Sequence, residues 1–146
     1  MLLVSFIAAF FTVLSPARSL DAVERRGARC EIRLTNSTVR PGGSGELEIL
    51  FSADEGFSIA TRPPVEVRFG KLSPLRVTSI TPVSMRSKSE LIDTRKPVVA
   101  GFIVEKKCKG GKHTVEGTVT YTVCSDAEGW STKVTEPFEL TFSVSP

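Results

Sequence analysis

Three cysteines and a single histidine are the side chains of this chain best suited to covalent chemistry. Cys124 follows an alternating run that ends at Val123, and it precedes Ser125 and Asp126. This arrangement is typical of a strand that ends in a loop. A lone thiol can begin an exchange with a disulfide, but nothing internal resolves the mixed disulfide that forms. The pattern therefore predicts a loop thiol capable of the first half of a dithiol exchange.

The residues around Cys124 do not predict an activated nucleophile. Asp126 and Glu128 follow it closely, and nearby carboxylates disfavour the thiolate. His113 lies at the far end of the same predicted strand, so no base is expected beside the thiol; we interpret it as a solvated residue flanking a turn. Cys108 lies near His113 in the sequence, but four ligands at zinc-type spacing are missing. We therefore expect no metal and no cofactor.

Short strands, separated by turns rich in glycine and proline, must position these residues. The strands predicted from alternation cover 28–34, 46–51, 65–69, 75–80, 98–107, 113–123 and 138–144. The segments 98–107 and 113–123 are expected to form a hairpin joined through 108–112. Residues 84–96 are polar and charged, which favours a loop or short helix. About seven short strands predict an all-β fold, an immunoglobulin-like antiparallel β-sandwich.

Strand alternation separates the three cysteines. Cys30 shares a face with Ile32, and Cys108 falls on the side of Val104, so both are expected to point inward. Cys124 falls on the polar face, and about ten residues of strand, over roughly 30 Å, keep it from Cys108. If disulfides form, an odd number of cysteines leaves one without a partner in the chain. We favour a Cys30–Cys108 disulfide with Cys124 free; the alternative is that all three are unpaired.

The amino-terminal stretch predicts export. Residues 2–14 are nearly all apolar, and Ala17 and Ser19 are the small residues that signal peptidase recognises. The run is too short for a comfortable membrane span. We predict a signal peptide over residues 1–19, a single domain over 20–146, and a periplasmic or secreted location. An uncleaved anchor is the alternative.

Charge is modest and interspersed along the chain, with a formal net charge of +3 over 146 residues. The densest basic patches are Arg25-Arg26 and the group formed by Lys106, Lys107 and Lys109. We interpret these patches as solvated strand ends rather than contacts to nucleic acid, and export favours the same interpretation.

Several motifs, taken in order, resemble the DsbD N-terminal domain family of thiol:disulfide interchange proteins. Residues 41–59 are similar to the family's early glycine turn, strand and Gly-aromatic-x-Ile segment. Residues 117–126 are similar to its strand and redox loop, with matches at Tyr121, Cys124 and Asp126. The resemblance implies a periplasmic immunoglobulin-like domain. In the full-length transporter this domain takes electrons from a thioredoxin-like domain and reduces partner oxidoreductases.

Three departures from the family pattern fall at the redox loop and its cover. Trp130 stands where the family has its second redox cysteine, and Ser131-Thr132-Lys133 replaces an aromatic-proline run. Residues 70–97 contain no Phe, Tyr or Trp, so an aromatic segment that would cap the loop is absent from the sequence. The resemblance therefore implies the scaffold of a protein-disulfide reductase without its cysteine pair.

Three functions are consistent with these departures. The favoured one is a module that binds periplasmic thioredoxin-like or disulfide-exchange proteins, with Tyr121, Asp126 and Trp130 as binding residues. The alternative for Trp130 is packing over a sheet edge. The enzymatic alternative is a one-cysteine oxidoreductase, in which Cys124 is catalytic and forms a mixed disulfide with a thioredoxin-like partner that supplies the resolving thiol. The third is a structural domain with an inert Cys124.

Overall fold

The computed structural model describes residues 27–81 and 90–146. The predicted signal peptide and the 84–89 part of the predicted loop lie outside these residues. Within them the chain forms nine strands and no helix. The strands are β1 (Ala28–Leu34), β2 (Thr38–Val39), β3 (Ser44–Ala53), β4 (Phe57–Ile59), β5 (Glu66–Phe69), β6 (Leu75–Thr81), β7 (Val98–Val104), β8 (Gly111–Ser125) and β9 (Ser131–Val144).

Two sheets pack face to face. One has the strand order β1-β3-β7-β6, and the other has the order β2-β9-β8-β4, with β5 also paired to β8. Neighbouring strands are antiparallel except β2 and β9, which pair in parallel over two residues. The predicted all-β, immunoglobulin-like sandwich is thereby confirmed. No helix in the described part of the chain is long and apolar enough to cross a membrane.

The predicted hairpin of 98–107 with 113–123 is wrong. β7 pairs with β3 and β6 in the first sheet, whereas β8 pairs with β9 in the second. Residues 105–110 therefore cross from one sheet to the other, and we call this segment the basic crossover. Turn residues specify that the chain reverses, but they do not specify which strand it pairs with next. The pairing of each strand is decided by how its apolar face packs against the opposite sheet of the sandwich.

Alternation along β8 builds much of the core, as predicted. Val119, Tyr121 and Val123 are buried, and their inward faces meet those of the opposite sheet. The ring of Tyr121 contacts the ring of Phe51 on β3 edge to face, at 4.9 Å between centroids. Each large apolar side chain buried in this way stabilises the fold by about 1.5–3 kcal/mol. The two sheets are therefore held by aromatic contact as well as by aliphatic packing.

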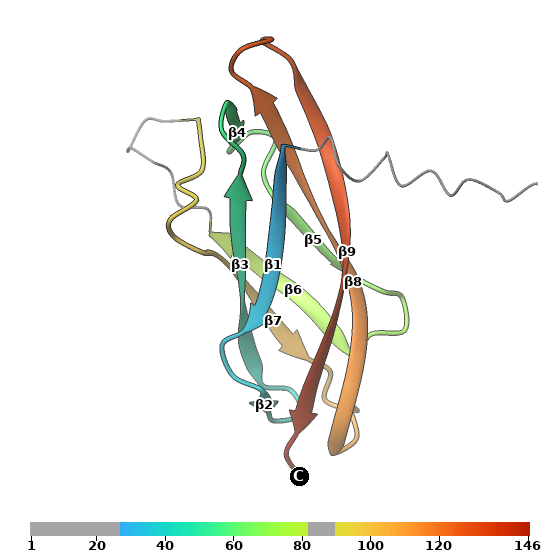
Figure 1. The fold of residues 1–146 in the computed structure, drawn as a ribbon. Coiled ribbons are helices and arrows are strands. Elements are labelled where there is room, and N and C mark those ends of the chain that lie inside the picture. The colour runs from blue at the N-terminus through green and yellow to red at the C-terminus, as the bar shows by residue number, and fades with distance from the viewer. Residues whose placement is uncertain (1–26, 82–89) are drawn as a thin grey trace, which may run out of the picture.

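The paired strands β8 and β9 run the length of the molecule (Figure 1). Residues 126–130 join them at one end, and we call this segment the tip loop. The basic crossover and the carboxyl terminus lie at the opposite end. Gly117, in the middle of β8, leaves room for Phe138 of β9, because a Cβ there would lie 2.4 Å from that ring. The tip loop and the basic crossover therefore lie far apart, at the two ends of the β8–β9 hairpin.

Candidate functional site

The tip loop is a closed turn tied to the neighbouring strand. The Ser125 amide donates to the carbonyl of Trp130 at 2.9 Å, and the Gly129 amide donates to the carbonyl of Ser125 at 2.9 Å. Gly129 has a φ of 69°, a left-handed conformation that favours glycine. The Asp126 amide donates to the Gly56 carbonyl at 2.9 Å. These bonds give the loop a defined shape without a partner.

Trp130 is half-buried and packs over the end of β4. Its ring lies 5.9 Å from that of Phe57, tilted by 57°. Its indole N–H donates to the carboxylate of Glu128. The contact with Phe57 is the sheet-edge packing expected as one of the two roles of this residue. Because both rings remain partly exposed, the same pair also forms an aromatic patch at the tip.

Cys124 lies near the tip, on the outer face of the second sheet, whereas Phe57 pairs with Ser125 and lies on the inner face. Cys124 pairs across the strands with Ser58 of β4 and Ser131 of β9. The neighbouring Val123 is fully buried, whereas Cys124 is partly exposed, which agrees with the predicted polar face. Asp126 accepts a hydrogen bond from the Ser58 hydroxyl at 3.2 Å, so its carboxylate fastens the loop to β4. Cys124 and Asp126 therefore meet Ser58 on the outer face of the tip, whereas Trp130 packs with Phe57 on the other face of the sheet.

Tyr121 does not belong to that surface. Its side chain is 1% exposed and points into the core. Its hydroxyl donates to Glu136 Oε1 at 2.5 Å and lies 3.3 Å from the carbonyl oxygen of Ala28. The sequence motifs predicted that Tyr121 is a binding residue. Its side chain lies inside the sandwich instead, because odd-numbered positions of β8 face inward.

Glu136 gathers three donors from two other strands. Besides Tyr121, it accepts the Cys30 amide and the Cys30 thiol, both at 3.2 Å from Oε2. Burial raises the pKa of the Cys30 thiol well above its ordinary value, and the hydrogen bond to the Glu136 carboxylate and its negative charge raise it further. The thiol therefore stays protonated and acts as a hydrogen-bond donor, which excludes it as a nucleophile.

The expected Cys30–Cys108 disulfide is absent, and all three cysteines are free. Cys30 pairs with Phe51 at the far end of β3, whereas the last residue of β7 bonds to Gly43 just before β3 begins. Eight residues of strand between these levels span on the order of 26 Å, and a disulfide requires Cα atoms within about 7 Å. Alternation along a strand predicts the face on which a side chain lies. It does not predict how far along the sheet that side chain lies from another.

Cys108 has a different partner, which the sequence interpretation missed. Its sulfur lies 3.6 Å from Nε2 of His113, across the start of β8. The same nitrogen is 2.6 Å from the carbonyl oxygen of Lys109, and the ring stacks on Phe142 at 5.5 Å. The signal available in the sequence was the five-residue separation across a glycine turn. Because β7 ends at Val104, Cys108 lies beyond the strand whose alternation was used to place it.

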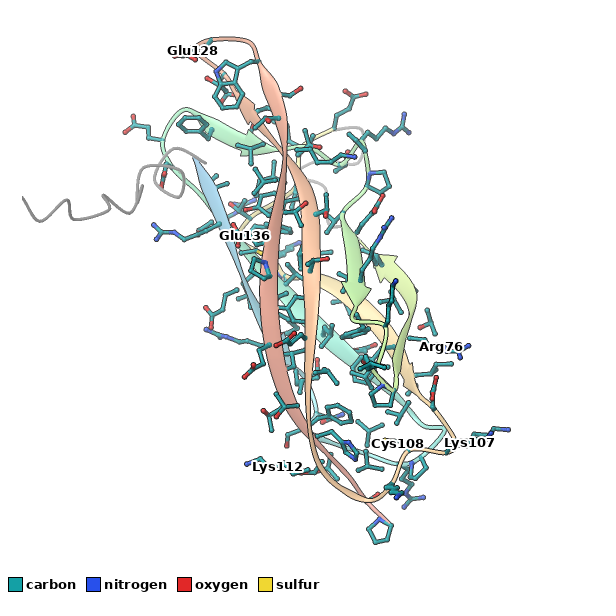
Figure 2. All side chains as sticks on the ribbon, turned by 90° about the vertical axis from the view of Figure 1, so that its right-hand side faces the viewer. Arg76, Lys107, Cys108, Lys112, Glu128 and Glu136 are labelled. Atoms are coloured by element: carbon teal, nitrogen blue, oxygen red, sulfur yellow. The ribbon has the colours of Figure 1, made fainter. Side chains whose placement is uncertain are left out.

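His113 also lines an open cleft of about 460 Å³. The cleft lies between the β5–β6 turn and the start of β8, and it contains Lys71, Glu116 and Glu139 as charged residues. In the described part of the chain, no group of three or more His, Cys, Asp or Glu side chains is arranged to hold a metal ion. Figure 2 shows Glu128 at the tip, Glu136 midway along the hairpin, and Cys108 with Lys107 and Lys112 at the other end.

Fold and site together define an immunoglobulin-like β-sandwich with single, separated thiols. Neither a family model nor a curated protein matches the chain. Several solved structures do. One is a cohesin module from a family 33 glycoside hydrolase of Clostridium perfringens, with 10% identity and a TM-score of 0.48. The alignment covers 80% of this chain and 96% of that module.

Two further solved structures are similar in fold. The N-terminal domain of Neisseria meningitidis DsbD in its reduced form has 10% identity and a TM-score of 0.36, over 78% of this chain and 88% of that domain. AggA, the major subunit of Escherichia coli aggregative adherence fimbriae type I, has 14% identity and a TM-score of 0.39, over 81% of this chain and 95% of that chain. At these identities the likeness concerns the fold alone.

Proposed function

We propose that this chain is a divergent, exported relative of the DsbD N-terminal domain that binds a protein partner through its tip and lacks complete dithiol chemistry. The observation that carries the proposal is the partly exposed Trp130–Phe57 pair at the tip, just beyond the end of the strand that carries Cys124. Tryptophan is enriched among residues that dominate binding energy. The partner we propose is a thioredoxin-like or disulfide-exchange protein of the periplasm.

Preorganisation of the tip supports a binding role. The loop is held by its own backbone hydrogen bonds and by the contact of Asp126 with Ser58, so little conformational freedom remains to be lost when a partner binds. Complete thiol exchange is disfavoured because Cys124 has no second thiol within reach. Cys30 is a hydrogen-bond donor in the interior, and Cys108 lies at the opposite end of β8.

The unique tryptophan allows a direct test of this proposal. Fluorotryptophan labelling gives a single fluorine resonance, from Trp130, and titration with an unlabelled thioredoxin-like protein should shift or broaden it. Affinity measured by calorimetry should fall at least about tenfold in Trp130→Ala, the loss of one hot-spot residue. The matched control is Ile103→Ala, which removes an exposed apolar side chain from the opposite sheet. Equal affinities for the two variants would exclude the tip as the docking surface.

The partial exposure of Cys124 on the outer face supports a second candidate, the one-cysteine oxidoreductase. The test uses a thioredoxin-like protein whose resolving cysteine is replaced by serine, activated as a mixed disulfide with an aromatic thiol. Attack by Cys124 would release that thiol and leave a covalent complex, and Cys124→Ser would abolish it. Failure of the wild-type chain to form this complex would exclude the enzymatic candidate.

A further inference from the structure

The turn between β5 and β6 carries the most exposed large apolar side chain in the described part of the chain. Leu72 is 100% exposed, against 40% for Ile103 on β7. Lys71 and Leu72 are the two central residues of this turn, which the Ser73 amide closes by donating to the Gly70 carbonyl at 3.0 Å. We call residues 70–73 the exposed turn. It projects from the side of the sandwich, in light green in Figure 1.

Backbone hydrogen bonds fix the exposed turn to both sheets. The Gly70 amide donates to the carbonyl of Glu116 on β8 at 2.9 Å, and the Glu105 amide donates to the carbonyl of Pro74, just after the turn, at 2.8 Å. Because the turn is already held in one conformation, little backbone freedom remains to be lost when another molecule covers its apolar side chain.

The open cleft of about 460 Å³ beside this turn has an acidic wall. Glu116 of β8 and Glu139 of β9 line it, and they lie directly opposite each other in the strand register. Like charges in such positions repel. Within residues 27–81 and 90–146 neither glutamate forms an ion pair, and neither does Lys71 on the other wall. A second cation placed between the two carboxylates would relieve this repulsion.

The exposed turn and the cleft are complementary in shape and charge, and they lie side by side on one molecule. We propose that this chain forms a twofold-symmetric homodimer, in which the exposed turn of each copy enters the cleft of the other. Leu72 is then covered by the cleft of the second copy, and Lys71 lies against that copy's Glu116 and Glu139. Twofold symmetry makes each of these contacts occur twice, because both copies present the same surface.

The size and position of this surface define what kind of dimer forms. A contact limited to two turns and two clefts is smaller than a standard interface, so we expect a Kd on the order of 100 μM. The cleft lies at the start of β8, whereas the tip loop follows the end of that strand. Both tip loops therefore stay exposed in the dimer, and dimer formation does not depend on the function proposed for the tip.

Sedimentation velocity on the purified protein, up to about 1 mM, tests the apolar half of the proposal. The wild type should pass from monomer to dimer, and Leu72→Asp should raise the Kd at least about tenfold. Ile103→Asp is the matched control, because it places the same charge at an exposed apolar position of the first sheet. A wild type that stays monomeric at every concentration, or equal Kd values for the two variants, would overturn the proposal.

A charge exchange tests the arrangement of the two copies. Lys71→Glu and the double variant Glu116→Lys/Glu139→Lys each place like charges at both contacts, so each alone should dimerise at least about tenfold more weakly than the wild type. Mixing the two variants, one of them carrying a fluorescent label, pairs opposite charges at both contacts. The mixed dimer should recover a Kd within about threefold of the wild type, and added salt should weaken it.

An ion pair formed within one copy would give a different result. Each variant would then keep its like charges in the mixture as well as alone, and mixing would restore nothing. A mixture that associates no more tightly than the two separate variants would therefore refute the proposed exchange of turns between copies. All the substituted residues are exposed, and thermal unfolding of each variant verifies that it is folded.

Discussion

The middle of the sandwich and its two ends place cysteine thiols in contrasting environments. In the middle, the Cys30 thiol donates to a half-buried carboxylate that also receives Tyr121. At the ends, Cys124 and Cys108 lie beside exposed loops, one acidic and one basic. The middle thiol is part of an interior hydrogen-bond network and contributes to stability, whereas the end thiols are partly exposed to other molecules. Three predictions test this division.

The largest effect on stability is expected when the hydrogen-bond network of Cys30, Tyr121 and Glu136, which we call the middle network, loses its acceptor. Glu136→Ala removes the carboxylate that receives Tyr121 and Cys30, and unsatisfied buried donors destabilise the fold by about 1–3 kcal/mol. Chemical denaturation should measure this loss. Glu136→Gln keeps one acceptor oxygen and should lose less, and Glu139→Ala, an exposed glutamate on the same strand, should change stability by less than about 0.5 kcal/mol. A loss no larger than that of Glu139→Ala would show that the network is not stabilising.

A smaller effect is expected at alkaline pH, where Cys30 links stability to proton binding. The pKa of Cys30 is raised in the folded state, chiefly by burial and then by Glu136. Its stabilising contribution is therefore present below the ordinary thiol pKa and is lost as pH rises above about 9, when the unfolded chain releases the proton and the folded chain retains it. After allowance for solvent screening, we expect a difference of up to about 1 kcal/mol per pH unit between wild type and Cys30→Ser.

Unfolding curves at several pH values between neutrality and pH 11 would measure that slope. The variant Cys124→Ser is the control, because it removes a thiol from an end and leaves the middle network intact. Parallel curves for wild type and Cys30→Ser would contradict the proposed linkage. A slope that also disappears in Cys124→Ser would place the linkage at the tip and overturn the division between middle and ends.

The smallest effect on stability is expected at the tip. Trp130→Ala removes the contact with Phe57, and an aromatic pair of this kind contributes about 0.5–1.5 kcal/mol. Because the pair is partly exposed, we expect a loss near the lower value, whereas partner affinity should fall at least about tenfold. Thermal unfolding and calorimetry on the same samples give the two quantities. A stability loss above about 3 kcal/mol would make Trp130 a core residue rather than a contact residue.

Much of the fold could be predicted from the sequence because alternation is a local property. The predicted strand 28–34 coincides with β1, and the inward faces of β3, β8 and β9 carry the residues that alternation selects. The placement of Cys124 on the outer face follows from the same rule. Strand ends were less accurate: β7 ends at Val104, three residues before the predicted end, and this shift removes Cys108 from the face to which it was assigned.

The candidate sites depended on contacts that no local pattern contains. Tyr121 was expected at a binding surface, but its hydroxyl meets Glu136, a residue without a distinguishing motif. His113 was interpreted as solvated, yet it lies against Cys108 because the basic crossover folds back on the start of β8. These contacts follow from which sheet each strand joins, and the turn sequence does not encode that choice.

By itself, the sequence determined an all-β chain, the faces of its strands and the presence of one thiol at the end of β8, since side-chain direction in a strand has a period of two. Tertiary structure alone decided the chemistry of the three thiols. Cys30 and Glu136 are 106 residues apart in the chain and 3.2 Å apart in space. A thiol's character depends on the charges and donors that surround it, and in a sandwich those neighbours come from strands distant in sequence.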